Sequence, residues 1–234
     1  MKTPLAALSA LAGATLALTG CGSSQTSSSS TASASAASSS AASQASSGKV
    51  QVFAAASLNN AGADLEKAYE AANPGVDITF VYEGSAKLVT QIEQGATPDM
   101  LITADTKNMD KAKKLGEFSG SDSTVLVTNK LVLVTAEGNP GKINSLDDLK
   151  NTNGVVAVCK EDVPCGTLAH QELKKHDITL KNATTEGKVT DVATKVSTGN
   201  ADAGFIYTTD LAAAKKKGAN LGSVELPDVE PNEY

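Results

Sequence analysis

The stretch of sequence that decides the fold is KVQVFAAASLNNAGADLEKAYEAANPGVDITFVYEGSAKL, residues 49–88. Residues 50–55 and 76–82 are apolar runs of strand length, and the segment 58–72 between them has apolar residues at helical spacing. A strand, a helix and a second strand in this order predict a parallel pair of strands, because a helix usually carries the chain back to the start of the sheet.

The same alternation continues along the chain. For a first lobe over 49–128 we expect helices at 86–94 and 107–115 and a strand at 99–103. Two extended apolar segments, 123–129 and 130–135, predict a crossover into a second lobe over 129–207. In that lobe we expect helices at 145–150, 167–175 and 189–198 and strands at 155–159 and 204–207. Residues 208–234 are expected to return to the first lobe and to form only part of it. The predicted fold is therefore two-lobed α/β, with mainly parallel sheets and a ligand cleft between the lobes.

The N-terminal residues have the features of an export signal. Residues 1–20 contain Lys2 and an apolar run from Leu5 to Leu18 that is shorter than the roughly 20 residues of a membrane span. The sequence Leu-Thr-Gly-Cys that ends at Cys21 resembles the lipidation signal of bacterial lipoproteins. Residues 21–48 are rich in Ser and Ala and predict a flexible tether. We expect an exported protein anchored by lipid at Cys21 to the outer face of the cytoplasmic membrane.

The composition narrows the class of ligand. The net charge is −6, the sequence contains no Arg or Trp, and it has only four Tyr and four Phe. A nucleic-acid partner is not expected, because the net charge is negative and no basic run precedes the cluster Lys215 to Lys217, which we expect to be a solvated helix end. Amino acids, sugars and nucleotides are also disfavoured, because Arg usually binds carboxylates and aromatic rings usually stack on sugars and bases.

Ser57 and Ser85 occupy equivalent places, each after a predicted strand and at the start of a predicted helix. Each serine is expected to cap its helix, while its hydroxyl and the following backbone N–H groups face the cleft. Two helix N-termini at one sheet edge form an anion site without any cationic side chain. Because both serines recur in matched positions, we expect them to bind an anion together.

Several stretches, in order along residues 50–234, resemble the extracytoplasmic molybdate-binding proteins of ABC importers. They are FAAASL at 53–58, GSAKL at 84–88 with QIE at 91–93, PDMLITAD at 98–105, VPCG at 163–166 and NADAGFIY at 200–207. The resemblance implies a type II periplasmic-binding-protein-like fold, a monomer that delivers molybdate or tungstate to an ABC permease, and no cofactor.

The resemblance also implies which residues surround the oxyanion. Two serine hydroxyls, two backbone N–H donors and a tyrosine hydroxyl bind the oxygen atoms of the anion. The protein therefore holds the metal atom only as part of the oxyanion. In this chain they correspond to Ser57, Ser85, Cys165, Val189 and Tyr207. Cys165 is a departure, because the family more often has Ala there. Val192 is the alternative to Val189, because an acidic residue precedes it.

Other ligands and activities stay open as alternatives. Sulfate, phosphate or another small anion is the main one, since selection would depend on the size of the cage. A lipoprotein hydrolase is more distant: GSAK at 84–87 lacks the Gly-x-Ser-x-Gly elbow, and we expect no enzyme. His170 and His176 are six residues apart, so they would not share a metal-binding face of a helix, and we expect both at the surface.

Cys159 and Cys165 are the thiols that remain once Cys21 is assigned to the lipid anchor. Disulfides persist outside the cytoplasm, and the short loop between the two cysteines could bring their Cα atoms within bridging distance. We therefore expect a Cys159–Cys165 disulfide beside the cleft, with a pair of free thiols as the alternative.

Overall fold

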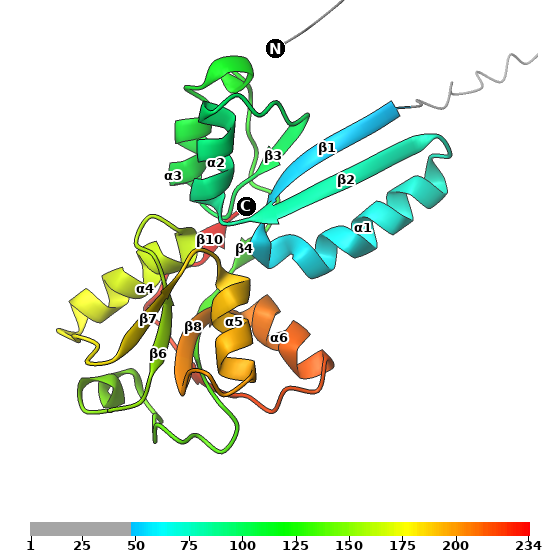
Figure 1. Cartoon of the computed structure of the whole chain (residues 1–234). Helices are drawn as coiled ribbons and strands as arrows, with labels where there is room; N and C mark the ends of the chain where they lie inside the picture. Colours follow the sequence, from blue (N-terminus) through cyan, green and yellow to red (C-terminus); the bar gives the residue numbers. More distant parts are fainter. Residues whose placement is uncertain (1–47) are drawn as a thin grey trace, which may run out of the picture. The chain divides into compact units, whose positions relative to one another are not determined.

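The computed structural model describes residues 48–234 (Figure 1). The expected signal segment 1–20, the lipidated Cys21 and the tether up to residue 47 lie outside the described residues. Gly48, which we assigned to the tether, is already the first residue of a strand. Within residues 48–234, no helix combines the length and the apolarity that crossing a membrane requires.

The first sheet is parallel and has the strand order β2-β1-β3. Its strands are β1 (Gly48–Ala55), β2 (Val76–Glu83) and β3 (Met100–Ile102). The register pairs Ala55 with Glu83, so β1 and β2 end at the same edge, each two residues before its serine, Ser57 or Ser85. This alignment brings both serines to one side of the sheet, as their matched positions predicted.

Three helices connect these strands or follow them. They are α1 (Asn59–Ala72), which continues a short 3₁₀ turn η1 (Ala56–Leu58), α2 (Ser85–Glu93) and α3 (Thr106–Ala112). A Cβ atom on Gly62 would lie 2.0 Å from the hydroxyl oxygen of Tyr82, so the glycine lets α1 approach β2 closely. Phe53, Leu88 and Leu101 belong to the core of this first lobe.

Two short antiparallel strands carry the chain between the lobes: β4 (Thr128–Asn129) and β10 (Asn232–Glu233). The predicted extended segment 123–129 is therefore a strand only at its end. Val125, Leu126 and Val127 are each more than half exposed. Backbone hydrogen bonds join Leu126 and Val127 to Tyr234, the residue that follows β10. A single short partner strand is too little to extend the ladder further.

The second sheet has the order β7-β6-β8-β5-β9 and encloses the larger core. Its strands are β5 (Leu131–Thr135), β6 (Val156–Cys159), β7 (Ala183–Glu186), β8 (Ala203–Tyr207) and β9 (Gly222–Glu225). β6 runs parallel to β7 and β8, whereas β5 is antiparallel to β8 and β9. The mainly parallel prediction therefore holds for one side of this sheet.

The helices of the second lobe are α4 (Pro164–Lys175), α5 (Val189–Ser197) and α6 (Thr208–Lys216). Helix α4 begins three residues earlier than predicted, because Pro164 occupies its first turn, where the missing N–H costs nothing. The predicted helix at 145–150 is a 3₁₀ helix, η3 (Leu146–Lys150), and η2 (Gly116–Phe118) is a further 3₁₀ turn.

The predicted return to the first lobe at residue 208 is wrong. Helix α6 contacts α5, β8 and β5, and β9 pairs with β5 along residues 222–225. Both elements therefore complete the second lobe, and the chain returns only at β10. The error arose because α6 follows β8 without a linker, and because β9 is a short edge strand with little apolar pattern.

Candidate functional site

One small cavity gathers residues from both lobes. It is lined by Ala55, Ala56, Ser57, Gly84, Ser85, Ala104, Val163, Pro164, Cys165, Val189 and Tyr207. All five residues that the sequence singled out are among them, and each of the five is buried. The cavity volume is about 10 Å³, close to what one water molecule needs, so only a compact ligand suits it.

Three helices begin at this cavity without a side-chain cap. The N-cap residues are Gly84 for α2, Val163 for α4 and Lys188 for α5, and no side-chain hydrogen bond caps any of these helices. Free N–H groups and the positive ends of the helix dipoles therefore face the cavity. None of the described residues that line it carries a charge. The arrangement favours an anion held by neutral donors.

The two serine hydroxyls do not cap their helices, so that part of the prediction is wrong. Ser85 is the first residue of α2 rather than its N-cap, and its Oγ accepts a hydrogen bond from the backbone N–H of Ala104 at 3.0 Å. Ser57 lies in η1, and its Oγ is 2.7 Å from the hydroxyl of Tyr234. Both hydroxyls are thus positioned by contacts with distant parts of the chain.

Tyr207 ends β8, and its hydroxyl accepts a hydrogen bond from Nδ2 of Asn232 in β10. Its ring meets that of Tyr234 edge-on, with the centroids 6.2 Å apart. Burial raises the pKa of Tyr207 well above its ordinary value and raises the pKa of Tyr234 to about 12. Both phenols therefore keep their protons at neutral pH and can donate hydrogen bonds.

The two backbone positions lie at the starts of the helices in the second lobe. Val189 is the first residue of α5 and lines the cavity, whereas Val192 is completely buried in the core of the lobe. Cys165 lies in the first turn of α4 and is joined to Cys159 at the end of β6 by a disulfide, with 5.9 Å between their Cα atoms. The predicted disulfide thus lies at the wall of the cavity.

Sequence reasoning missed three residues that touch these hydroxyls: Ala104, Asn232 and Tyr234. Ala104 falls within the stretch 98–105 that carried the family resemblance, so its position near the site could have been predicted from the sequence. Tyr234 is 177 residues from Ser57 in the sequence, and a local sequence pattern cannot predict a contact between residues so far apart.

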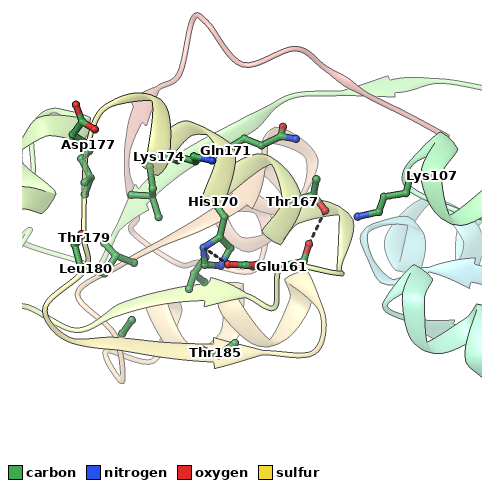
Figure 2. A pocket seen from close by; sticks show the side chains of 14 residues that line it. Lys107, Glu161, Thr167, His170, Gln171, Lys174, Asp177, Thr179, Leu180 and Thr185 are labelled. Carbon is green, nitrogen blue, oxygen red and sulfur yellow. Dashed lines mark hydrogen bonds and ion pairs between the residues drawn. The ribbon is translucent and has the colours of Figure 1, made fainter.

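A much larger hollow of about 1010 Å³ runs along α4 and has a different character (Figure 2). Thr167 donates a hydrogen bond to the backbone carbonyl oxygen of Glu161 at 2.8 Å, and His170 Nδ1 is 3.8 Å from a carboxylate oxygen of the same residue. Its lining mixes lysines with acidic residues, and it contains none of the five residues that the sequence singled out. It is therefore not the candidate anion site.

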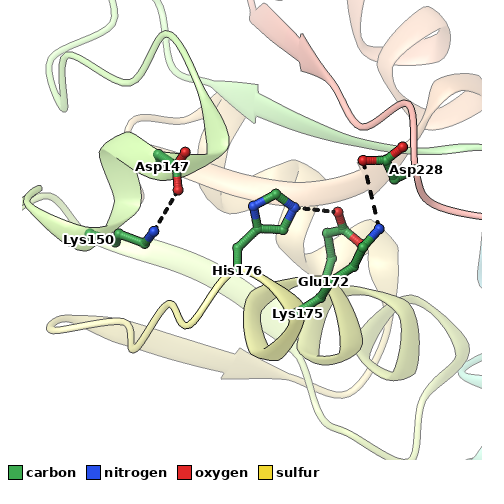
Figure 3. A network of polar contacts seen from close by, with 6 residues as sticks. All are labelled: Asp147, Lys150, Glu172, Lys175, His176 and Asp228. Atoms are coloured by element: carbon green, nitrogen blue, oxygen red, sulfur yellow. Dashed lines mark hydrogen bonds and ion pairs between the residues drawn. The ribbon is translucent and has the colours of Figure 1, made fainter.

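A second polar cluster joins α4 to the connection after β9 (Figure 3). One ligand atom each of Glu172, His176 and Asp228 lie within 4.8 Å of one another, a spacing compatible with a cation. The ammonium of Lys175 already lies 3.9 Å from Glu172 and 3.7 Å from Asp228, so it offsets one of the two negative charges and occupies the space beside both carboxylates. We therefore interpret the cluster as an ion-pair network.

The histidines, which we expected at the surface, are each only about a third exposed. His170 Nε2 is 3.2 Å from the carbonyl oxygen of Cys159, and His176 Nε2 is 3.1 Å from a carboxylate oxygen of Glu172. The two rings therefore have separate partners, the end of β6 for His170 and the α4 residue Glu172 for His176.

The family of the chain follows from comparison with known proteins. A family model described as bacterial extracellular solute-binding protein matches residues 50–229. The chain belongs to this family. Its two lobes, with the cavity between them, have the type II periplasmic-binding-protein-like fold.

Curated relatives of this solute-binding protein include the molybdate-binding protein ModA of Mycobacterium tuberculosis, 42% identical over 168 residues. That alignment covers 72% of this chain and 64% of the relative, so the chain spans less than two thirds of the mycobacterial protein. ModA of Escherichia coli is 33% identical over 73% of this chain and 70% of its own length. The putative ABC transporter substrate-binding lipoprotein YvgL of Bacillus subtilis is 34% identical, over 70% and 65% respectively.

Solved structures show the same fold. The substrate-binding domain of a putative molybdenum ABC transporter from Clostridium difficile is 28% identical, with a TM-score of 0.53 over 79% of this chain and 82% of that one. The sulfate-binding protein SubI of Mycobacterium tuberculosis has a TM-score of 0.69 over 79% and 73%, but at 16% identity this likeness concerns the fold alone.

Proposed function

We propose that this solute-binding protein captures molybdate or tungstate outside the membrane and delivers it to the permease of an ABC importer. The observation that carries the proposal is the buried cavity in which Ser57, Ser85 and Tyr207 meet three uncapped helix N-termini. The names of the mycobacterial and Escherichia coli relatives support molybdate as the ligand.

The donor set suits a tetrahedral dianion. Burying such an ion is costly unless every oxygen receives hydrogen bonds, and neutral donors in a preformed cage can supply them. Molybdate and tungstate have longer bonds to oxygen than sulfate, so a cage fitted to them would leave sulfate with stretched, weaker hydrogen bonds. Sulfate is the second candidate, because it carries the same charge and shape.

We also propose that the protein is anchored by a lipid on Cys21 and that it has no enzymatic activity. Lipidation at Cys21 is supported by the Leu-Thr-Gly-Cys sequence and by the lipoprotein name of the Bacillus subtilis relative. None of the described residues that line the proposed site pairs a nucleophile with a base, so we expect a protein that binds and releases its ligand unchanged. We also propose that it acts as a monomer and needs no cofactor.

Isothermal titration of the chain with molybdate, tungstate, sulfate and phosphate tests the function. We expect one molybdate or tungstate per chain, bound much more tightly than sulfate. Sulfate or phosphate binding at least as tightly as molybdate would overturn the proposed specificity.

A further inference from the structure

We propose that Glu83 and Lys188 form a bridge between the two lobes that holds the cavity closed around its ligand, so that this ion pair sets the rate at which the anion leaves. Neither residue is among those that line the cavity, and both therefore act as positioning residues for the backbone donors beside them. The inference rests on the proposed function in that an anion occupies the cavity, and it names the residues that control the release of that anion.

The carboxylate of Glu83 contacts one lysine from each lobe. Its Oε1 lies 2.8 Å from Nζ of Lys87 in α2, and its Oε2 lies 3.6 Å from Nζ of Lys188 in the second lobe. Among the ion pairs of the described side chains, Glu83–Lys188 alone joins the two lobes. The two side chains are only 21% and 29% exposed, so salt and water screen their attraction less than that of a surface pair.

Both residues directly precede residues that line the cavity. Glu83 is the last residue of β2 and is followed by Gly84, whereas Lys188 is the N-cap of α5 and is followed by Val189. A bridge between them therefore fixes the first turn of α5 against the start of α2. Because a hydrogen bond weakens as its donor moves away, this spacing decides whether donors from both lobes can reach one anion together.

Each of these charges is unfavourable at its position without the other. A carboxylate beside an oxyanion site repels the ligand, and a lysine at a helix N-cap meets the positive end of the helix dipole, where Ser, Thr, Asp or Asn is preferred. Burial would raise the pKa of Glu83, but Lys87 and Lys188 hold it below its ordinary value, so the carboxylate is ionised at neutral pH. The bridge offsets both penalties, which a separate role for either residue would not do.

The sign of the effect of Glu83→Gln separates a bridge from a simple effect of charge. If only the electrostatic field at the anion mattered, this variant would lose a negative charge and bind molybdate more tightly. Because the pair is a bridge, we expect Glu83→Gln and Lys188→Met each to weaken molybdate binding about fivefold, mainly through faster dissociation. In the double variant the two losses should not add, because the same contact is lost only once.

Lys87→Met is the matched control. It removes the other lysine that pairs with Glu83 and changes the net charge as Lys188→Met does, but it leaves the bridge between the lobes in place. Its dissociation rate should stay within about twofold of the parent's. Stopped-flow tyrosine fluorescence measures that rate, since Tyr207 lines the cavity, and calorimetric titration measures the affinity. Added sodium chloride should speed dissociation from the parent but not from Glu83→Gln.

The outcomes separate this inference from the proposed function. Tighter binding in Glu83→Gln, or equal dissociation rates in Lys87→Met and Lys188→Met, would overturn the bridge and leave the proposed function standing. A thermal melt of each variant confirms that the compared proteins are folded. A parent that binds sulfate instead of molybdate would overturn the proposed ligand alone, and the same variants titrated with sulfate would then decide the inference.

Discussion

The carbonyl oxygen of Gly187 lies 2.4 Å from the position that a Cβ atom on Gly84 would occupy. Gly84 follows β2 and caps α2 in the first lobe, whereas Gly187 precedes α5 in the second. The two backbones therefore touch beside the cavity. The neighbouring pair Glu83 and Lys188 adds an ion pair of 3.6 Å across the same contact.

This contact predicts that Gly84→Ala weakens anion binding whereas the matched substitution Gly187→Ala does not. In Gly84→Ala the added methyl group would force the lobes apart and weaken anion binding by at least tenfold, roughly the effect of a misplaced hydrogen-bond donor. Gly187→Ala should bind almost normally, because a Cβ atom there meets nothing within 4 Å. Titration with molybdate and a thermal melt of each variant check this, and equal affinities in the two would contradict it.

The serine hydroxyls give a second prediction. Ser57→Ala and Ser85→Ala should each reduce the binding free energy by about 1.5 to 3 kcal/mol, the usual range for a hydrogen bond to a charged group. Ser223→Ala, at an exposed position on the edge strand β9, serves as the control. Calorimetric titration measures the loss, and unchanged affinity in both serine variants would remove these residues from the site.

The alternation of strands and helices was predictable because the early strands are apolar runs of six to eight residues. The paired ends of β1 and β2 then follow from a parallel sheet, which is why Ser57 and Ser85 could be placed together from sequence. Edge strand β7, with the sequence ATTE, was not predictable, because it lacks an apolar run.

The partners of the hydroxyls were also beyond the sequence pattern. The Ser57–Tyr234 and Tyr207–Asn232 contacts form only when the strand β10 returns beside β4. They depend on where the chain crosses between lobes, and that crossing was placed too early at residue 208. The disulfide was predictable because two cysteines six residues apart can meet across one tight loop.

The Cys159–Cys165 disulfide gives a third prediction, because it ties the first turn of α4 to the end of β6. Closing so short a loop contributes only about 2 kcal/mol to global stability by chain entropy. It should matter more locally, by holding the Cys165 N–H in place before the ligand binds. We therefore expect the Cys159→Ser, Cys165→Ala double variant to lose more oxyanion affinity than unfolding free energy.

Denaturant unfolding and titration of that double variant, each beside the parent, provide the comparison. Reduction of the parent with dithiothreitol should reproduce the loss of affinity. A double variant that binds as tightly as the parent would contradict the local role of the disulfide, and so would two alkylatable thiols in the non-reduced protein.

The buried carboxyl group of Asp210 makes the unfolding free energy depend on pH. Burial raises the pKa of this carboxyl group from 3.8 to about 7, although its oxygen accepts a hydrogen bond from the Tyr207 backbone N–H at 3.3 Å. Between these two values the folded protein holds a proton that the unfolded chain has released. The unfolding free energy therefore falls as pH rises through this window and is level above it.

The last prediction compares the parent with Asp210→Asn, whose amide oxygen can still accept the hydrogen bond from Tyr207 but cannot ionise. At pH 4 the two proteins should have similar stability, because Asp210 is neutral in the folded parent. At pH 8 the variant should be more stable, by an amount that the difference between 3.8 and about 7 limits to about 4 kcal/mol. Urea unfolding of both proteins at several pH values gives the difference directly, which removes the contribution of every other titrating group. A difference that stays constant from pH 4 to pH 8 would show that Asp210 is ionised in the folded protein throughout this range.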